Sequence, residues 1–461
     1  MSIFDRQRLA HTTFKLDTER MRAGWYSDKY FENIVGMLAV LAAREYGFAG
    51  HSTRLAALGI DARGVDIGNL EVEAQWFTRR TPFSVVAGID KALAMLQLCT
   101  GYAAADGTWV DTAAELAIEA VHDGAIVRYD GDPLNIVPVL KVRGRYRDFA
   151  LLETPTLGAL TRATRIATNV YHVMVAARGK PVLFFPARFD AHEVQAADGY
   201  AYNIALQRYN LDYSGHNEAF ISTDAQGDWW GGLGGGTIAH SAIAALLGDT
   251  VETMLAFAAT RPVQIPRVVL VDFDNDCVGT ARAVMAAMFA RYRELTDAGQ
   301  SEAAQRYVLF GVRPDTGGTL RDVSVLPLGD KALDMGVTPR LVFNLRHAID
   351  DAWQGWDLPD RWRDRARDWC RAVRIVATGG FAAKKIRRFE ELGVPVDIYG
   401  VGSSLFSNSD EEGTNNDFTT DIVRIRVRDT WHELAKVGRR ARPNPDLEHV
   451  QEPVNPLVRT S

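Results

Sequence analysis

Hydrophobic positions in the first 150 residues change between helical and strand spacing. Apolar residues recur at helical intervals over 30–46 and 86–103, whereas short strand-like runs stand at 124–129 and 135–144. Helices and strands that are mixed in this way are typical of an α+β domain. We therefore expect residues 1–150 to form an N-terminal α+β domain.

The pattern changes at residue 151, where a long helical run leads through 157–179 into a strand-like run at 181–185. Beyond residue 266, strands and helices alternate. The expected strands are 266–273, 306–312, 373–378 and 396–401, and the expected helices are 279–295, 338–353, 360–370 and 382–393. Repeated strand–helix units imply parallel strands joined by right-handed crossovers. We predict an α/β domain over residues 151–405.

Polar strings follow the ends of these strands, namely DFDND, RPDTGG, TGGF and GVGSS. The C-terminal ends of strands form the active face of a (β/α) barrel, although an open α/β sheet also uses them. We favour the barrel. The remaining segment, 406–461, starts polar and acidic, contains a strand-like run at 420–428 and ends rich in proline. We expect this C-terminal segment to pack on the N-terminal domain.

Composition and charge narrow the class of protein. Of the 461 residues, 47% are hydrophobic and 24% are charged, as in ordinary globular proteins. The net charge of -6 gives no general attraction for nucleic acid or anionic lipid. Cys99, Cys277 and Cys370 lack paired spacing, and no apolar run approaches the roughly 18 residues of a membrane span. We expect a cytoplasmic protein that binds neither nucleic acid nor membrane and holds any anion by local contacts.

Two glycine-rich turns, 377–381 and 399–404, close successive predicted strands. Backbone N–H groups can approach an anion closely there, and a helix N-terminus adds favourable charge. Either turn alone is also a common tight connection, but paired turns on late strands match the way barrels bind a sugar phosphate. A dinucleotide fingerprint would need glycine in place of Leu405, and no P-loop string occurs. We predict a phosphate cradle at these two turns.

Charged side chains follow two earlier strands. Arg313 and Asp315 stand in GVRPDTGG, where an arginine fork can clamp a phosphate and a carboxylate can steady positive charge at an anomeric carbon. Asp272, Asp274 and Asp276 alternate in VDFDND, where a carboxylate can bind Mg²⁺ together with substrate phosphates. A surface turn and a helix cap are the alternative interpretations. Among the three aspartates we select Asp272 as the functional residue and Mg²⁺ ligand.

A glycine-rich run at 231–236 leads into an apolar helix that we expect over 242–257. Thr237, His240 and Ser241 then lie in or beside its first turn, where backbone donors favour an anion. A single histidine at a helix start is more often structural than catalytic. His240 is therefore a candidate that depends on support from the rest of the sequence.

The wording and order of eight short strings resemble the nicotinate phosphoribosyltransferase family. The strings are SDKYF (27–31), ETPTLGALTRATRIAT (153–168), FPAR (185–188), GTIAHS (236–241), VDFDND (271–276), VRPDTGG (312–318), ATGGF (377–381) and GVGSSL (400–405). The resemblance implies a type II phosphoribosyltransferase with an α/β N-terminal domain, an irregular barrel, and a homodimer with shared active sites. It also implies an enzyme that joins nicotinate to phosphoribosyl pyrophosphate with Mg²⁺ and ATP, giving nicotinate mononucleotide and pyrophosphate in NAD salvage.

The resemblance also implies roles at the base end of the site. Tyr30 is similar to the tyrosine that is lent across the dimer, and Phe185 to the aromatic residue that stacks on the pyridine ring. Arg188 is similar to the arginine near phosphoribosyl pyrophosphate and the pyridine substituent. His240 falls on the family histidine that ATP phosphorylates.

At the phosphate end, Arg313 and Asp315 match the family pair that holds ribose and pyrophosphate. Asp272 matches the first carboxylate after the preceding strand. The residues that fall on the family's 5′-phosphate cradle are Gly379, Gly380, Gly400, Gly402 and Ser403.

Two departures from the family pattern keep other functions open. Gly318 stands where the family usually has an acidic residue, and the segment 213–232 replaces the Gly-Gly-x-Asp-Gly string beside the base. The acidic position of that string could correspond to Asn217, Glu218, Asp224 or Asp228. The alternatives are transfer to nicotinamide or another pyridine base, and a catalytically silent relative that binds ligand.

A further alternative is a phosphosugar isomerase or lyase barrel with Lys384 or Lys385 as its base or Schiff-base residue. Both lysines stand in the charged helical run 382–393, which usually marks a solvated helix face.

Overall fold

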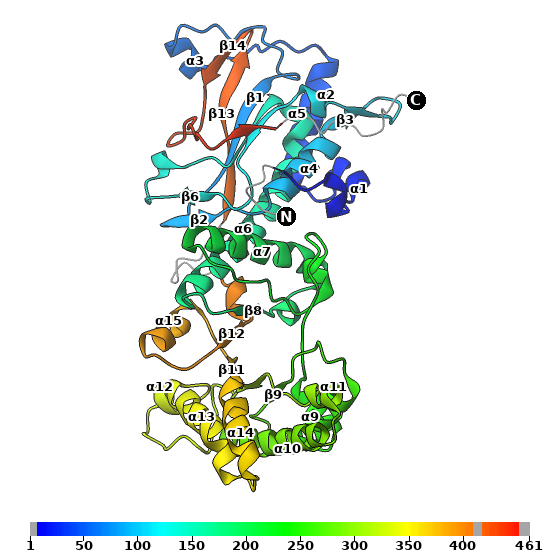
Figure 1. Cartoon of the computed structure of the whole chain (residues 1–461). Helices are drawn as coiled ribbons and strands as arrows, with labels where there is room; N and C mark the ends of the chain where they lie inside the picture. The colour runs from blue at the N-terminus through cyan, green and yellow to red at the C-terminus, as the bar shows by residue number, and fades with distance from the viewer. Residues whose placement is uncertain (1–6, 409–416, 451–461) are drawn as a thin grey trace. The chain divides into compact units, whose positions relative to one another are not determined.

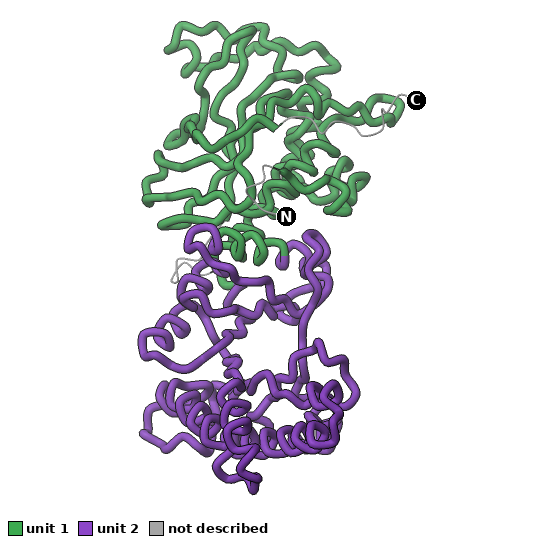
Figure 2. Tube along the Cα trace, viewed as in Figure 1, with its two compact units in different colours: residues 1–168, 200–208, 407–461 green, residues 169–199, 209–406 purple. Residues whose placement is uncertain are grey.

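The computed structural model describes residues 7–408 and 417–450 (Figure 1). Contacts divide the chain into two compact units (Figure 2). Unit 1 comprises residues 1–168, 200–208 and 407–461, and unit 2 comprises residues 169–199 and 209–406. The chain passes between the units within two long helices, α6 (Glu153–Ala176) and α7 (Gln195–Tyr213), and again after residue 406. The predicted domain boundary at 150 and 151 falls just before α6.

Unit 1 is built on an antiparallel sheet with the strand order β14-β13-β1-β7-β5-β15. Its strands are β1 (Glu71–Thr78), β5 (Ala117–Ala120), β7 (Leu140–Arg145), β13 (Phe418–Val427), β14 (Thr430–Glu433) and β15 (Glu448–His449). Two small pairs are β2 (Phe83–Val85) with β6 (Ile126–Arg128) and β3 (Gly101–Ala103) with β4 (Trp109–Asp111). Because β13 pairs with β1 and β15 pairs with β5, the predicted return of the C-terminal segment to the N-terminal domain is confirmed. The Pro-rich end of that segment, 451–461, lies outside the described residues.

Helices pack on the unit 1 sheet around one apolar core. They are α1 (Thr18–Arg22), α2 (Lys29–Ala43), α3 (Thr53–Ala57), α4 (Ile89–Cys99), α5 (Tyr146–Phe149) and the first part of α6. Trp76, Leu96, Leu140 and Leu160 belong to this core and are fully buried. The Trp76 indole N–H donates to Thr156 Oγ1 at 3.1 Å, so α6 is fixed to the middle of the sheet by a polar contact as well.

Unit 2 contains five parallel strands in the order β8-β12-β11-β10-β9. They are β8 (Val182–Phe184), β9 (Val268–Leu270), β10 (Gly311–Arg313), β11 (Arg374–Ala377) and β12 (Ile398–Val401). The helices of this unit are α8 (His240–Ala245), α9 (Thr250–Thr260), α10 (Cys277–Asp297), α11 (Ser301–Gln305), α12 (Lys331–Asp334), α13 (Pro339–Asp351), α14 (Asp360–Ala372) and α15 (Ala383–Glu391). The α/β fold class is therefore confirmed.

The helices between these strands follow the sequence pattern. Thr338 caps α13 by accepting from Leu341 N, and Pro339 occupies the first helical position, where its missing N–H costs nothing. Asp276 caps α10 in the same way by accepting from Gly279 N. The helices α10, α13 and α14 pack against one another (Figure 1). Among the described helices, none combines the length and apolar character that crossing a membrane requires.

The single helix predicted over 242–257 is wrong, because the structure contains two helices there. Leu247 and Gly248 both adopt positive φ angles, of 61° and 84°, which end α8. Asp249 then starts α9 by accepting from Glu252 N at 2.9 Å. The break leaves His240 at the start of a helix of only six residues.

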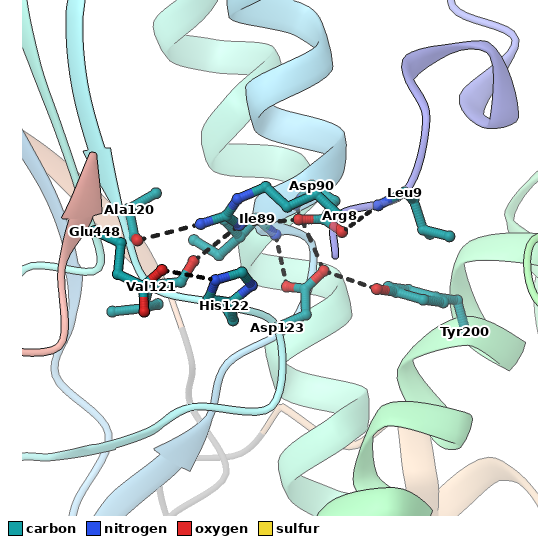
Figure 3. Close-up of polar contacts among 10 residues, drawn as sticks. All are labelled: Arg8, Leu9, Ile89, Asp90, Ala120, Val121, His122, Asp123, Tyr200 and Glu448. Carbon is teal, nitrogen blue, oxygen red and sulfur yellow. Dashed lines mark hydrogen bonds and ion pairs between the residues drawn. The ribbon is translucent and has the colours of Figure 1, made fainter. Parts of the chain in front are cut away.

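Unit 1 also contains two neighbouring buried aspartates (Figure 3). Asp90 forms an ion pair with Arg8 at 3.0 Å and accepts from Leu9 N at 2.8 Å. Asp123 accepts from Ile89 N at 2.8 Å and lies 3.0 Å from the Tyr200 hydroxyl. Burial, together with the charge of Asp90, raises the pKa of Asp123 to about 7. Arg8 pairs directly with Asp90, whereas burial and the charge of Asp90 favour the protonated form of Asp123.

We expect Asp123 to make unit 1 less stable as the pH rises from about 4 to about 7, because its folded pKa is raised above the ordinary value of 3.8. The folded chain holds this proton throughout that window while the unfolded chain releases it near pH 4. Replacing Asp123 with asparagine, which imitates the protonated form, should flatten this slope in thermal unfolding between pH 4 and pH 8.

Glu153 titrates over the same range, since burial raises its pKa to about 7 as well. The test is therefore the difference in slope between the wild type and the Asp123→Asn variant. Equal slopes for the two proteins would show that Asp123 does not take up this proton.

Candidate active site

The carboxyl ends of the five parallel strands in unit 2 each lead into a predicted site residue. Phe185 follows β8, Gly402 follows β12, Gly379 follows β11, Asp315 follows β10 and Asp272 follows β9. Parallel strands end at the same edge of a sheet, so residues far apart in the sequence are brought to one edge.

His240 and Asp272 are in direct contact. His240 Nε2 lies 3.1 Å and 3.0 Å from the two carboxylate oxygens of Asp272. The Asp272 side chain is 9% exposed, whereas that of His240 is 43% exposed, so the aspartate anchors a ring that remains accessible. Burial raises the pKa of Asp272 and the nearby His240 opposes that shift. A histidine held through Nε2 has its Nδ1 available for chemistry.

Arg313 carries a buried donor that the protein leaves unused. One terminal nitrogen of its guanidinium donates to the Ile238 carbonyl at 3.4 Å, and the buried Nε has no hydrogen-bond partner. Burial lowers the pKa of Arg313, while Asp315 and Asp272 act in the opposite direction. Within the described part of the chain Arg313 forms no ion pair. A desolvated guanidinium with an unmade hydrogen bond is suited to an anionic ligand.

The first glycine-rich turn faces Asp315. Gly379 and Gly380 have φ angles of 93° and 65°, a backbone conformation that favours glycine. A Cβ atom on Gly379 would lie 3.4 Å from Asp315 Oδ1. Thr378 donates through its backbone N–H to the Pro314 carbonyl at 3.2 Å, which ties this turn to the Arg313 loop.

The second glycine-rich segment packs against aromatic side chains. Gly400 lies inside β12 rather than in the turn after it, and a Cβ there would stand 2.8 Å from the Phe185 ring. A Cβ on Gly402 would stand 2.7 Å from the Phe189 ring. Ser404 Oγ donates to the Phe381 carbonyl at 2.8 Å and so joins the two glycine-rich segments. The structure thus uses Gly400 for close packing, whereas the turn itself begins at Gly402 and Ser403.

The remaining predicted residues are placed less centrally. Arg188 is exposed, lies over the Phe189 ring at 5.0 Å and is close enough to Arg313 to lower its pKa. Thr237 precedes Ile238, whose carbonyl accepts from Arg313, and Ser241 is exposed in α8. Tyr30 belongs to unit 1, at the start of α2, with its hydroxyl 3.2 Å from Asp28.

A family model and solved structures of known proteins are similar to this chain. Residues 55–164 match the family model described as quinolinate phosphoribosyl transferase, N-terminal domain. The structure is similar to that of nicotinate-nucleotide pyrophosphorylase from Pyrococcus furiosus, with a TM-score of 0.59, 21% identity, and coverage of 92% of this chain and 80% of that chain. The chain has the type II phosphoribosyltransferase fold.

Human nicotinic acid phosphoribosyltransferase is a second solved structure to which the chain is similar. The TM-score is 0.48 with 16% identity, over 87% of this chain and 75% of that chain. A comparison with curated protein sequences found no match.

Within this type II phosphoribosyltransferase fold, the acidic residues near the predicted site do not form a metal cage of their own. The described residues contain no group of three or more His, Cys, Asp or Glu side chains placed to hold a metal ion. Mg²⁺ in proteins is commonly held by one or two carboxylates together with substrate phosphates. The pair Asp272 and Asp315 fits this mode of binding, in which the phosphate oxygens complete the coordination.

The sequence named Lys385 only as a candidate base or Schiff-base residue of an isomerase or lyase, and its place at the glycine-rich turn was not predicted. Lys384 is exposed, as a solvated helix face predicts, but Lys385 is partly buried and donates from Nζ to the Gly379 carbonyl at 3.0 Å. A cation in the first turn of a helix is unusual, because the N-terminal end of the helix dipole is positive. The position of Lys385 in the first turn of the predicted helix was therefore the sequence signal that could have indicated a role at the turn.

The loop that replaces the family's acidic string at 213–232 is held by its own polar contacts. Asp224 Oδ1 accepts from Gly234 N at 2.9 Å. Asn217 is bonded to Asn210 through its backbone N–H at 3.1 Å. These contacts explain how the loop is shaped, and they do not select one acidic residue for the base.

Proposed function

We propose that the chain is a phosphoribosyltransferase that joins nicotinate to phosphoribosyl pyrophosphate, giving nicotinate mononucleotide and pyrophosphate. The observation that carries the proposal is the partly buried Arg313, whose buried Nε has no partner among the described residues, next to Asp272 and to Asp315, which faces the Gly379 turn. In the reaction, the pyridine nitrogen forms a bond to the anomeric carbon of ribose while the bond from that carbon to pyrophosphate breaks. The product would enter NAD synthesis by salvage.

The phosphate end of the substrate would lie at the glycine-rich turns. The left-handed backbone at Gly379 and Gly380, together with the turn at Gly402 and Ser403, leaves room for N–H groups to face a 5′-phosphate. Asp315 beside this turn would face the ribose. Its negative charge would stabilise positive charge that develops at the anomeric carbon.

The leaving pyrophosphate would be held by Arg313. Its buried Nε would gain the hydrogen bond that the protein does not supply, and the guanidinium would balance the negative charge of the leaving oxygen. Asp272 and Asp315 would hold Mg²⁺, which neutralises the pyrophosphate when it is bound. Positioning and electrostatic stabilisation supply most of the catalysis in such a site.

The base would be held between Phe185 and Arg188. Phe185 presents a partly buried ring beside β12, and a ring face can stack on a pyridine. Arg188 is exposed on the short helix Ala187–Phe189, which follows β8, and could pair with the carboxylate of nicotinate. This pairing is the feature that favours nicotinate over the uncharged nicotinamide.

His240 is the proposed acceptor of a phosphoryl group from ATP. Asp272 fixes Nε2 of the imidazole, so Nδ1 is the nucleophile, and the aspartate also stabilises the charge that forms on the ring. In this step Nδ1 forms a bond to the γ-phosphorus of ATP while the bond from that phosphorus to ADP breaks, and water later hydrolyses the phosphohistidine to release phosphate. ATP therefore acts as a co-substrate that assists turnover. This role is separate from the transfer to the pyridine nitrogen, because the exchange of bonds at the anomeric carbon is complete without a phosphohistidine.

The proposed active form is a homodimer that shares its sites. In unit 1, α2 is an apolar helix of which only Phe31 and Leu38 are buried, while Tyr30, Met37 and Val40 are 58%, 54% and 49% exposed. Such an uncovered apolar helix face is typical of a subunit interface. Tyr30 stands at the first turn of this helix, where it could reach the base of a neighbouring subunit.

Quinolinate is the second candidate base, because residues 55–164 match the quinolinate phosphoribosyl transferase N-terminal domain. Transfer to this dicarboxylate would release CO₂ as well as pyrophosphate, which distinguishes it from transfer to nicotinate. The unusual 213–232 loop keeps nicotinamide and other pyridines as alternative bases. A silent ligand-binding relative and a phosphosugar isomerase or lyase are further alternatives.

The proposal is tested with purified full-length protein, phosphoribosyl pyrophosphate and Mg²⁺, with nicotinate, nicotinamide and quinolinate compared singly and in competition. We expect nicotinate to give the highest rate of nucleotide formation, and we expect ATP to increase it in the wild type but not in the His240→Ala variant. The exposed His192 supplies a control, since His192→Ala should keep the ATP effect. A higher rate with quinolinate, together with release of CO₂, would show that quinolinate is the substrate and not nicotinate.

A further inference from the structure

Lys385 reaches back from the first turn of α15 onto the glycine-rich turn that precedes it. Its Nζ donates to the Gly379 carbonyl at 3.0 Å and lies 4.2 Å from the centre of the Phe381 ring. The centre of the Phe389 ring is 5.8 Å from Nζ. The ammonium group therefore lies at the Gly379 carbonyl and close to two aromatic rings.

The positive charge of Lys385 is not balanced by the protein. In the described residues no carboxylate forms an ion pair with Nζ, and α15 has no acidic residue in its first turn. The adjacent end of the helix dipole is itself positive. An ammonium group has three donors, of which the Gly379 carbonyl uses one. Two donors and one positive charge therefore remain at this turn.

Burial also opposes the charged form of this side chain. Desolvation lowers the pKa of Lys385 to about 8, and no nearby group counters it. A structural lysine on a helix surface would instead point into water, as the exposed Lys384 does.

We infer that Lys385 is a ligand of the phosphate monoester that binds at the Gly379–Gly380 turn, which in the proposed reaction is the 5′-phosphate of phosphoribosyl pyrophosphate. The inference rests on the proposed function for the identity of that phosphate. The dianion accepts the two remaining donors of Nζ and supplies the missing negative charge. Lys385 thereby holds the ribose end of the substrate, whereas Arg313 holds the pyrophosphate end.

Ribose 5-phosphate is the probe, because it carries this phosphate and lacks the pyrophosphate. Its affinity is measured by isothermal titration calorimetry for the wild type and for Lys385→Met, Lys385→Gln and Lys384→Met. We expect the two neutral Lys385 variants to bind about 10- to 100-fold more weakly, since a charge-assisted hydrogen bond is lost. Lys384→Met should bind as the wild type does, and Lys385→Arg should recover part of the affinity.

The outcomes separate this inference from the function on which it rests. Wild-type affinity for ribose 5-phosphate in Lys385→Met or Lys385→Gln, with an unchanged thermal midpoint, would overturn the role of Lys385 and leave the proposed function standing. A wild type that binds no ribose 5-phosphate and forms no nucleotide would overturn both. Using two neutral variants keeps the test decisive if one of them does not fold.

Discussion

The Arg313→Met variant is expected to lose turnover by about 10²- to 10³-fold while keeping its fold, because it removes donors aimed at the leaving pyrophosphate. In the free protein the guanidinium is desolvated, its Nε has no partner, and its one hydrogen bond is a long one to the Ile238 carbonyl. Removing a group that is so poorly satisfied should cost little stability. Steady-state kinetics with phosphoribosyl pyrophosphate and chemical denaturation measure the two effects.

The Arg313→Lys variant is the control for charge. Lysine keeps a positive charge and lacks the planar fork, so activity between that of the wild type and Arg313→Met is expected. A methionine variant that unfolds more easily and is otherwise as active as the wild type would show that Arg313 is structural.

The Arg267→Met variant is expected to lower the free energy of unfolding of unit 2 by about 3–5 kcal/mol. This is the size of loss seen when one member of a buried ion pair is removed. Arg267 is 2% exposed and makes five hydrogen bonds to backbone carbonyls within the described residues. Four of these carbonyls lie in the last turn of α9 or between α9 and β9, and the fifth belongs to Arg306, directly after α11. Those carbonyls would be left buried and unpaired. Denaturation followed by tryptophan fluorescence measures the change.

Arg306 is the matched control for this stability prediction. It is exposed and donates a single hydrogen bond to the Ala259 carbonyl at 3.0 Å. The Arg306→Met variant should therefore cost less than about 1 kcal/mol, as is usual for surface contacts. Equal losses for the two variants would mean that the carbonyl cluster around Arg267 does not stabilise unit 2.

Local sequence patterns predicted most of unit 2, because its strand–helix units are local in sequence. Apolar spacing predicted helices from 279 and from 338, and the structure places the caps Asp276 and Thr338 at or close to these starts. The break after α8 was also readable, since Gly248 followed by Asp249 is a helix stop followed by a cap. The continuous apolar run through both helices concealed it.

Strand β1, at the centre of the unit 1 sheet, could not be recognised from local pattern. It carries Glu73 and Gln75 in a strand that is almost wholly buried. Glu73 pairs with Arg143 at 2.6 Å and with Arg424 at 3.2 Å, and Gln75 bonds to backbone groups of the C-terminal segment. Arg143 is 70 residues from Glu73 in the sequence, and the partners in the C-terminal segment are more than 350 residues from β1. The sequence near the strand therefore does not explain why polar side chains are buried there.

The candidate site shows the same division. Residues such as Asp272, Asp315 and Gly379 could be selected because they follow predicted strands, and parallel strands end at one edge. The contact between His240 and Asp272 required the fold, and so did the placement of Lys385 over Phe381. A charged helix pattern gives the same sequence signal whether a lysine is solvated or turned toward a ligand.

The most direct test of the central claim is the formation of a pyridine mononucleotide from phosphoribosyl pyrophosphate by the purified chain. With Mg²⁺ and nicotinate present, we expect nicotinate mononucleotide and pyrophosphate in equal amounts, with formation greatly reduced in Arg313→Met. Absence of any nucleotide with nicotinate, nicotinamide and quinolinate, in the presence and absence of ATP, would contradict it.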